Sequence, residues 1–138
     1  MVRSFITTWV ISFCVAAHAE VQAPAAKVVS TSSGVYTSGQ ASRGEQTYMS
    51  ICVSCHPKGS YTAPAFRDKW NGALLSDLYG FISTSMPKME PGSLEPEEYA
   101  QVLAYLLKIN GAPTGKGELP ADAKALRRIR ISFPKNGK

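Results

Sequence analysis

The amino-acid sequence predicts a single all-α domain, and three observations lead to this prediction. Apolar residues recur at helical spacing in three segments, residues 40–56, 74–84 and 96–110. The segments between them are rich in proline and glycine, and no convincing strand pattern precedes the paired cysteines. The chain has 138 residues, which suits one domain better than two.

Residues 1–19 have the pattern of a secretory signal peptide. Arg3 supplies a positive charge, residues 5–17 are mostly apolar, and the sequence Ala-His-Ala at 17–19 is a typical cleavage site. We expect cleavage before Glu20, export to the bacterial periplasm and no stable membrane span afterwards. The alternative is that the segment stays uncleaved as a membrane anchor.

Removal of this segment leaves few chemically distinctive side chains. Cys14 and His18 lie within it, so the mature chain keeps Cys52 and Cys55 as its cysteines and His56 as its histidine. In an oxidising compartment two such cysteines would ordinarily form a disulfide.

The first helix follows a segment without helical or strand pattern. Residues 20–39 are rich in Ala, Ser, Thr and Gly, and we expect a flexible leader. The helix of residues 40–56 contains Gly44, which costs about 1 kcal/mol relative to alanine and therefore suggests a close backbone contact. Pro57 ends the helix, and residues 57–71 are expected to form a loop.

The strongest helix signal lies near the end of the domain. Residues 74–84 place leucines, Phe81 and Ile82 on one face, and a proline-rich loop follows. In the sequence "EPEEYAQVLAYLLKING", Pro96 suits the first helical position and the final Asn-Gly pair suits the end. The domain is therefore expected to span residues 40–111, with an extension at 112–138 that holds a short helix near residues 121–129.

The positive charge of the chain lies mainly in this extension. The whole chain has a formal charge of +5, residues 38–111 are nearly balanced, and residues 112–138 carry seven basic residues against Glu118 and Asp122. For an exported protein this charge does not indicate nucleic-acid binding. It suggests either a segment that steers or anchors an acidic partner, or a solvated extension.

The sequence "CVSCH" at residues 52–56 has three possible uses. A structural zinc site needs four donors, and the mature chain offers three Cys and His side chains. A thioredoxin-like dithiol lies at the start of a helix after a strand, whereas this pair ends a helix. C-x-x-C-H is also the attachment sequence for c-type haem, in which two cysteines bind the porphyrin edge and the histidine binds iron. Haem is the prediction that agrees with export.

The second axial ligand cannot be a histidine, because His56 is the single histidine of the mature chain. Met49, Met86, Met89, a lysine or no residue are the possibilities. Met49 lies one turn before Cys52 and so on the wrong side of the ring. Met86 and Met89 share a loop that follows a helix, and Met86 is favoured. Either methionine is otherwise a flexible core residue.

The segments "RGEQTYMSICVSCH", "APAF", "TSMP" and "EYAQVLAYLLKING" make residues 40–111 resemble the monohaem class I cytochromes c. This resemblance implies a fold in which the first and last helices cross and loops wrap one covalent haem. Gly44 and Tyr48 match that crossing on the first helix; on the last helix the matching residues are Leu103, Tyr105 and Leu106.

The resemblance also implies roles for two further residues. Pro64 matches the family proline whose carbonyl accepts a hydrogen bond from the ligand histidine, or it is an ordinary loop proline. Trp70 would bind a haem propionate or simply pack in the core. The resemblance implies cofactor binding by Cys52, Cys55 and His56. Pro57 departs from the family pattern, which more often has glycine or another flexible residue at this position.

The resemblance implies an electron carrier and no enzyme activity. The loop and last helix look most like small cytochromes that serve periplasmic quinoprotein dehydrogenases. The expected partners are therefore redox proteins: such a dehydrogenase as donor, and a terminal oxidase or another cytochrome as acceptor. Two alternatives are a haem enzyme or gas sensor with an open iron site, and a structural subunit that acts through its basic extension.

Overall fold

The computed structural model describes residues 27–135, so the expected signal peptide at residues 1–19 lies outside the described residues. The elements, in chain order, are β1 (Val29–Ser30), η1 (Thr31–Ser33), α1 (Ser38–Thr47), η2 (Tyr48–Cys52), α2 (Gly59–Thr62), α3 (Pro64–Trp70), α4 (Leu75–Ser85), α5 (Pro96–Ile109), α6 (Ala123–Leu126) and β2 (Ile129–Arg130). The structure is mainly helical, as predicted, with one small sheet of two strands. No helix in this part of the chain is long and apolar enough to cross a membrane.

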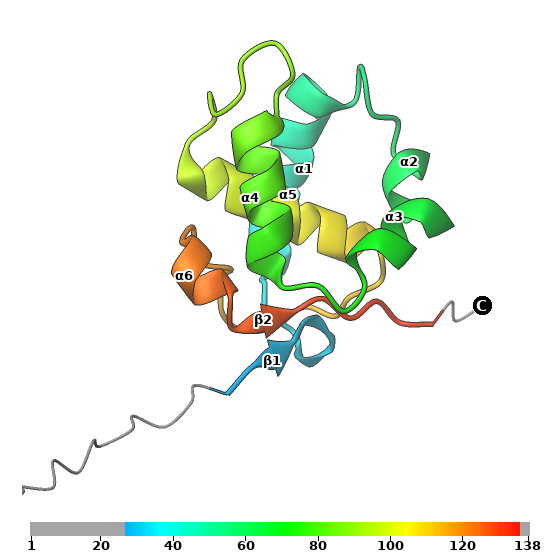
Figure 1. Cartoon of the computed structure of the whole chain (residues 1–138), viewed down its shortest axis with the longest axis vertical. Coiled ribbons are helices and arrows are strands. Elements are labelled where there is room, and N and C mark those ends of the chain that lie inside the picture. Colours follow the sequence, from blue (N-terminus) through cyan, green and yellow to red (C-terminus); the bar gives the residue numbers. More distant parts are fainter. Residues whose placement is uncertain (1–26, 136–138) are drawn as a thin grey trace, which may run out of the picture.

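Helices α1 and α5 cross at the centre of the domain, where Figure 1 shows α5 running past α1 and α4. A Cβ atom added to Gly44 would lie 1.8 Å from the carbonyl oxygen of Gln101. The two backbones therefore touch at a point where only glycine fits. The close contact expected from the glycine inside the first helix is confirmed.

The sequence signals at the ends of α5 act as predicted. Pro96 is its first residue, and the backbone amide of Glu95 donates to the Glu98 carboxylate over 3.0 Å. Asn110 ends the helix, and Gly111 follows with a φ of 82°, which favours glycine. Helix α4 begins and ends one residue later than predicted.

Two segments contain more helix than predicted. Helix α1 begins at Ser38, two residues early, because the Thr37 hydroxyl accepts a hydrogen bond from the Gln40 amide over 3.1 Å. The prediction of loop over residues 57–71 is wrong, since α2 and α3 lie there. Pro64 occupies the first position of α3, where its fixed φ favours a helix.

The first described residues pair with the C-terminal extension, which differs from the expected flexible leader. Strands β1 and β2 are parallel, with Val29 opposite Ile129, and lie side by side at the bottom of Figure 1. The buried side chain of Gln40 donates to the Leu119 carbonyl over 2.9 Å and accepts from its amide over 2.8 Å. These bonds order both segments because they satisfy backbone groups that would otherwise be buried without partners.

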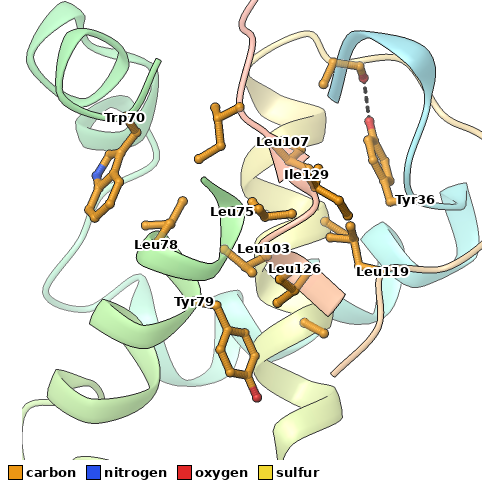
Figure 2. Close-up of a cluster of buried hydrophobic side chains, with 14 of the residues drawn as sticks. Tyr36, Trp70, Leu75, Leu78, Tyr79, Leu103, Leu107, Leu119, Leu126 and Ile129 are labelled. Atoms are coloured by element: carbon orange, nitrogen blue, oxygen red, sulfur yellow. Dashed lines mark hydrogen bonds between the residues drawn. The ribbon is translucent and has the colours of Figure 1, made fainter. Parts of the chain in front are cut away.

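The extension completes the larger of two groups of buried side chains, the core cluster, which Figure 2 shows in part. Leu119, Leu126 and Ile131 are at most 3% exposed. The Tyr36 hydroxyl donates to the Ala112 carbonyl over 2.6 Å, the dashed line in Figure 2. The expected short helix is present as α6. Residues 112–135 are therefore part of the folded domain.

A second and smaller group of buried side chains, the pocket cluster, is contributed by η2 and α5. It consists of Tyr48, Val102, Tyr105 and Leu106. The rings of Tyr48 and Tyr105 have centroids 5.0 Å apart. Three of its four members, all except Tyr105, line a pocket.

Candidate functional site

A pocket of about 830 Å³, part of it open to solvent, lies between η2, the end of α4 and helix α5. The lining residues are mostly apolar or aromatic, with two cysteines and one histidine among them. They are Tyr48, Ile51, Cys52, Ser54, Cys55, His56, Tyr61, Ile82, Met86, Pro87, Lys88, Met89, Leu94, Tyr99, Val102 and Leu106.

One wall of the pocket carries the cysteines and the histidine. Element η2 is a single π-helical turn that continues α1 as far as Cys52. The chain then turns, and the His56 amide donates to the Cys52 carbonyl over 2.9 Å. Cys52 is half-buried and Cys55 is exposed, and both are free thiols. Burial raises the pKa of the Cys52 thiol.

The loop after α4 brings two methionines to the same pocket. Met86 follows α4 directly, is partly buried, and donates its amide to the Ile82 carbonyl over 2.9 Å. Met89 also lines the pocket, although its side chain is 92% exposed. Met49 is exposed and is not among the lining residues. The structure therefore brings both loop methionines to the pocket.

The floor of the pocket is apolar and aromatic. Val102 and Leu106 of α5 lie beside Tyr48 from the first wall. Tyr61 packs edge-on against Tyr48, with centroids 5.9 Å apart, and burial raises the pKa of its phenol to about 12. Neutral aromatic and aliphatic side chains of this kind suit an apolar cofactor better than a charged ligand.

The donor set of the pocket fits a covalently bound haem. Two thiols, an imidazole and two thioethers line a pocket whose other lining residues are mostly apolar or aromatic. For a zinc site the residues fit poorly, because no three His, Cys, Asp or Glu side chains within residues 27–135 come close enough to hold a metal ion.

Two of the predicted site residues lie away from the pocket lining. Pro64 is exposed at the start of α3. Trp70 is buried in the core cluster, where Figure 2 shows it near Leu78. Its ring lies 5.8 Å from that of Phe81, and the Lys69 ammonium lies 5.0 Å from the indole centroid. The roles proposed for Pro64 and Trp70 toward haem remain predictions.

Sequence analysis did not single out Tyr61 or Tyr99 as pocket residues. Tyr99 shares one face of α5 with Val102 and Leu106, at helical spacings of three and four residues. That spacing could have identified Tyr99. Tyr61 lies in a segment that was expected to be a loop, and no periodic pattern marks it.

A comparison with protein families agrees with the chemistry of this pocket. Residues 39–106 match the family described as cytochrome c oxidase, cbb3-type, subunit III. No curated protein and no solved structure matches the chain. The matched residues include every residue that lines the pocket and most of α5. The family match and the C-x-x-C-H segment in the pocket wall together support a c-type cytochrome, with its cytochrome c domain at residues 39–106.

Proposed function

We propose that this chain is a periplasmic electron-transfer protein of the class I cytochrome c type. In this proposal Cys52 and Cys55 bind one haem c covalently, His56 is one axial ligand and Met86 is the other. The supporting observation is that one mostly apolar pocket brings together Cys52, Cys55, His56 and Met86.

Each of these residues has a defined task in the proposal. A haem c supplies one-electron chemistry when it is bound. His56 and Met86 would hold the iron, and with both bound no position would remain for a substrate. The tyrosine and aliphatic residues of the floor exclude water from the pocket and so favour the less charged, reduced form. Exposed Cys55 marks the edge at which a redox partner would approach.

The proposed partners are a dehydrogenase as donor and a respiratory acceptor. The sequence resemblance supports a periplasmic quinoprotein dehydrogenase, and the matched family is named for a subunit of a respiratory oxidase. The exposed side chains of Lys124, Arg127 and Arg128, in and just after α6, support an acidic partner. Binding to such a partner is expected to be brief and to weaken as salt is added.

The absorption spectrum of the exported, reduced protein with and without carbon monoxide tests this proposal. We expect a c-type haem spectrum that does not change when the gas is added, because His56 and Met86 occupy both axial positions. Met86→Ala should then bind carbon monoxide, whereas Met89→Ala should not. A prompt spectral shift in the unaltered protein would instead indicate an open site, as in a sensor or haem enzyme.

A further inference from the structure

Two buried tyrosines donate to the main-chain carbonyls of the two residues proposed as iron ligands. The Tyr48 hydroxyl donates to the carbonyl of His56, and the Tyr99 hydroxyl donates to the carbonyl of Met86 over 2.7 Å. Tyr48 is 1% exposed and Tyr99 is 4% exposed, and both line the pocket. The backbone of each proposed ligand therefore accepts a hydrogen bond from a tyrosine of η2 or of α5.

The bond from Tyr99 matters because the Met86 loop has few other attachments. Its turns are closed internally, by the Glu90 amide on the Pro87 carbonyl and the Gly92 amide on the Met86 carbonyl. The Met86 amide joins the loop to the preceding helix α4. Among the hydrogen bonds of the described residues, the one from Tyr99 is the one that joins residues 86–94 to α5.

Tyr99 is itself held firmly in place. Its ring packs edge-on against Tyr79 of α4, with centroids 6.3 Å apart and an angle of 78° between the planes. Its helix is fixed by the backbone contact at Gly44. The position of the Tyr99 hydroxyl is therefore set by the two helices that flank the loop.

Met89 provides the contrast. It lies in the same loop and also lines the pocket, but its side chain is 92% exposed and its backbone forms no hydrogen bond to another described residue. We propose that Tyr99 is a positioning residue that selects Met86 rather than Met89 as the methionine opposite His56, with Tyr48 as its counterpart on the His56 side. This inference rests on the proposed function, because it takes His56 and Met86 as the ligands.

The test is an imidazole titration of the oxidised, haem-loaded protein, followed by its absorption spectrum. Imidazole competes with the methionine for iron, so its apparent affinity reports how firmly the methionine is held. We expect Tyr99→Phe to bind imidazole about tenfold more tightly, which corresponds to the loss of one buried hydrogen bond. Equal affinities for Tyr99→Phe and the unaltered protein would overturn the proposal.

Tyr79→Phe is the matched control. Tyr79 belongs to the same aromatic pair, lies outside the pocket lining, and its hydroxyl makes only a long bond of 3.5 Å to the Pro96 carbonyl. Its affinity for imidazole should stay within about twofold of the unaltered value. A gain equal to that of Tyr99→Phe would mean that general loosening, and not the bond to Met86, is responsible, which also overturns the proposal.

Met86→Ala separates this inference from the proposed function. If it binds imidazole no better than the unaltered protein, Met86 is not the ligand and the proposed function fails in that part. If it binds imidazole far more tightly while Tyr99→Phe does not, the ligand assignment stands and only the role of Tyr99 fails.

A second measurement uses the unaltered, reduced protein and does not depend on any variant folding. A buried, hydrogen-bonded phenol proton exchanges slowly with solvent and gives its own proton NMR signal. Such a signal from Tyr99, close to the protons of Met86, is expected. A Tyr99 hydroxyl proton that exchanges freely with water would overturn the proposal.

Discussion

The core cluster and the pocket cluster share helix α5 but are completed in different ways. The C-terminal extension covers the core cluster, where Leu126 is fully buried and Ile131 is 1% exposed. The pocket cluster instead faces an open cavity whose other lining residues include Ile51, 39% exposed, and Met89. The chain therefore covers one side of α5 with its own extension, while the other side lines the pocket that would hold the haem. A small domain gains stability from both sources.

The largest effect is expected where the two clusters meet, at the α1–α5 crossing. Gly44→Ala places a Cβ atom 1.8 Å from the Gln101 carbonyl oxygen, so the helices must separate and both clusters open. We expect a loss of about 4 kcal/mol in the free energy of unfolding, or no folded protein. Denaturant unfolding measures this loss.

Gly80→Ala is the control for this substitution, since it changes a glycine inside α4 where an added Cβ would meet no atom within 4 Å. It should raise stability by up to about 1 kcal/mol, because alanine favours a helix. A loss for Gly44→Ala no larger than the change for Gly80→Ala would show that the helices do not touch closely at the crossing.

A substitution in the core cluster tests whether the two clusters are independent, because it disrupts the packing of the core cluster alone. Leu126→Ala removes a fully buried side chain from the extension and should cost about 3 kcal/mol in the free energy of unfolding. The absorption spectrum of the bound haem should stay unchanged, since Leu126 does not line the pocket. A spectrum altered in the folded variant would mean that the two clusters are coupled through α5.

The smallest effect concerns the charged contacts beside the pocket cluster. The Glu45 carboxylate lies 3.0 Å from the Lys108 ammonium of α5 and 3.7 Å from that of Lys58. Its hydrogen bond with Lys108, together with the two positive charges, lowers the pKa of Glu45. A lowered pKa means that the folded state favours the carboxylate, so the stabilisation is present near neutral pH and is lost as the pH falls through that pKa.

Glu45→Gln should therefore reduce stability by about 0.5 kcal/mol at pH 7, a value typical of exposed ion pairs. The difference should shrink as the pH falls through the lowered pKa of Glu45, and it should also shrink in high salt. Thermal unfolding at several pH values measures it, with Glu90→Gln in the exposed loop as the control. A difference that persists in acid would contradict the role of the carboxylate charge.

The sequence predicted the helices with strong periodicity and clear end signals. Helix α5 begins at Pro96 and closes at Asn110 because proline, the capping glutamates and Gly111 all act locally. The cysteine and histidine wall was also predictable, since its three residues lie within one turn. Gly44 indicated a close contact, and the resemblance named the partner helix.

Other features depend on contacts between distant segments and left no local signal. Residues 29–30 pair with residues 129–130, so neither segment has a strand pattern of useful length. The buried Gln40 side chain forms two hydrogen bonds with the backbone of Leu119. A polar residue within a helical pattern does not by itself predict such a contact. Burial of the basic extension was missed because its charged residues conceal the apolar positions between them.

The hydroxyl of Thr31 donates to the Ser132 carbonyl and accepts from the Ser132 amide, and these partners are 101 residues apart in the chain. A chain made from its amino end completes residues 52–56 long before residue 132. Contacts so distant in sequence form late, because the loop between them must first be closed. The extension packs on the core cluster and does not line the pocket, so Cys55 is exposed even after this pairing has formed. The pairing that closes the core cluster late therefore leaves the cysteines and histidine accessible both before and after it forms.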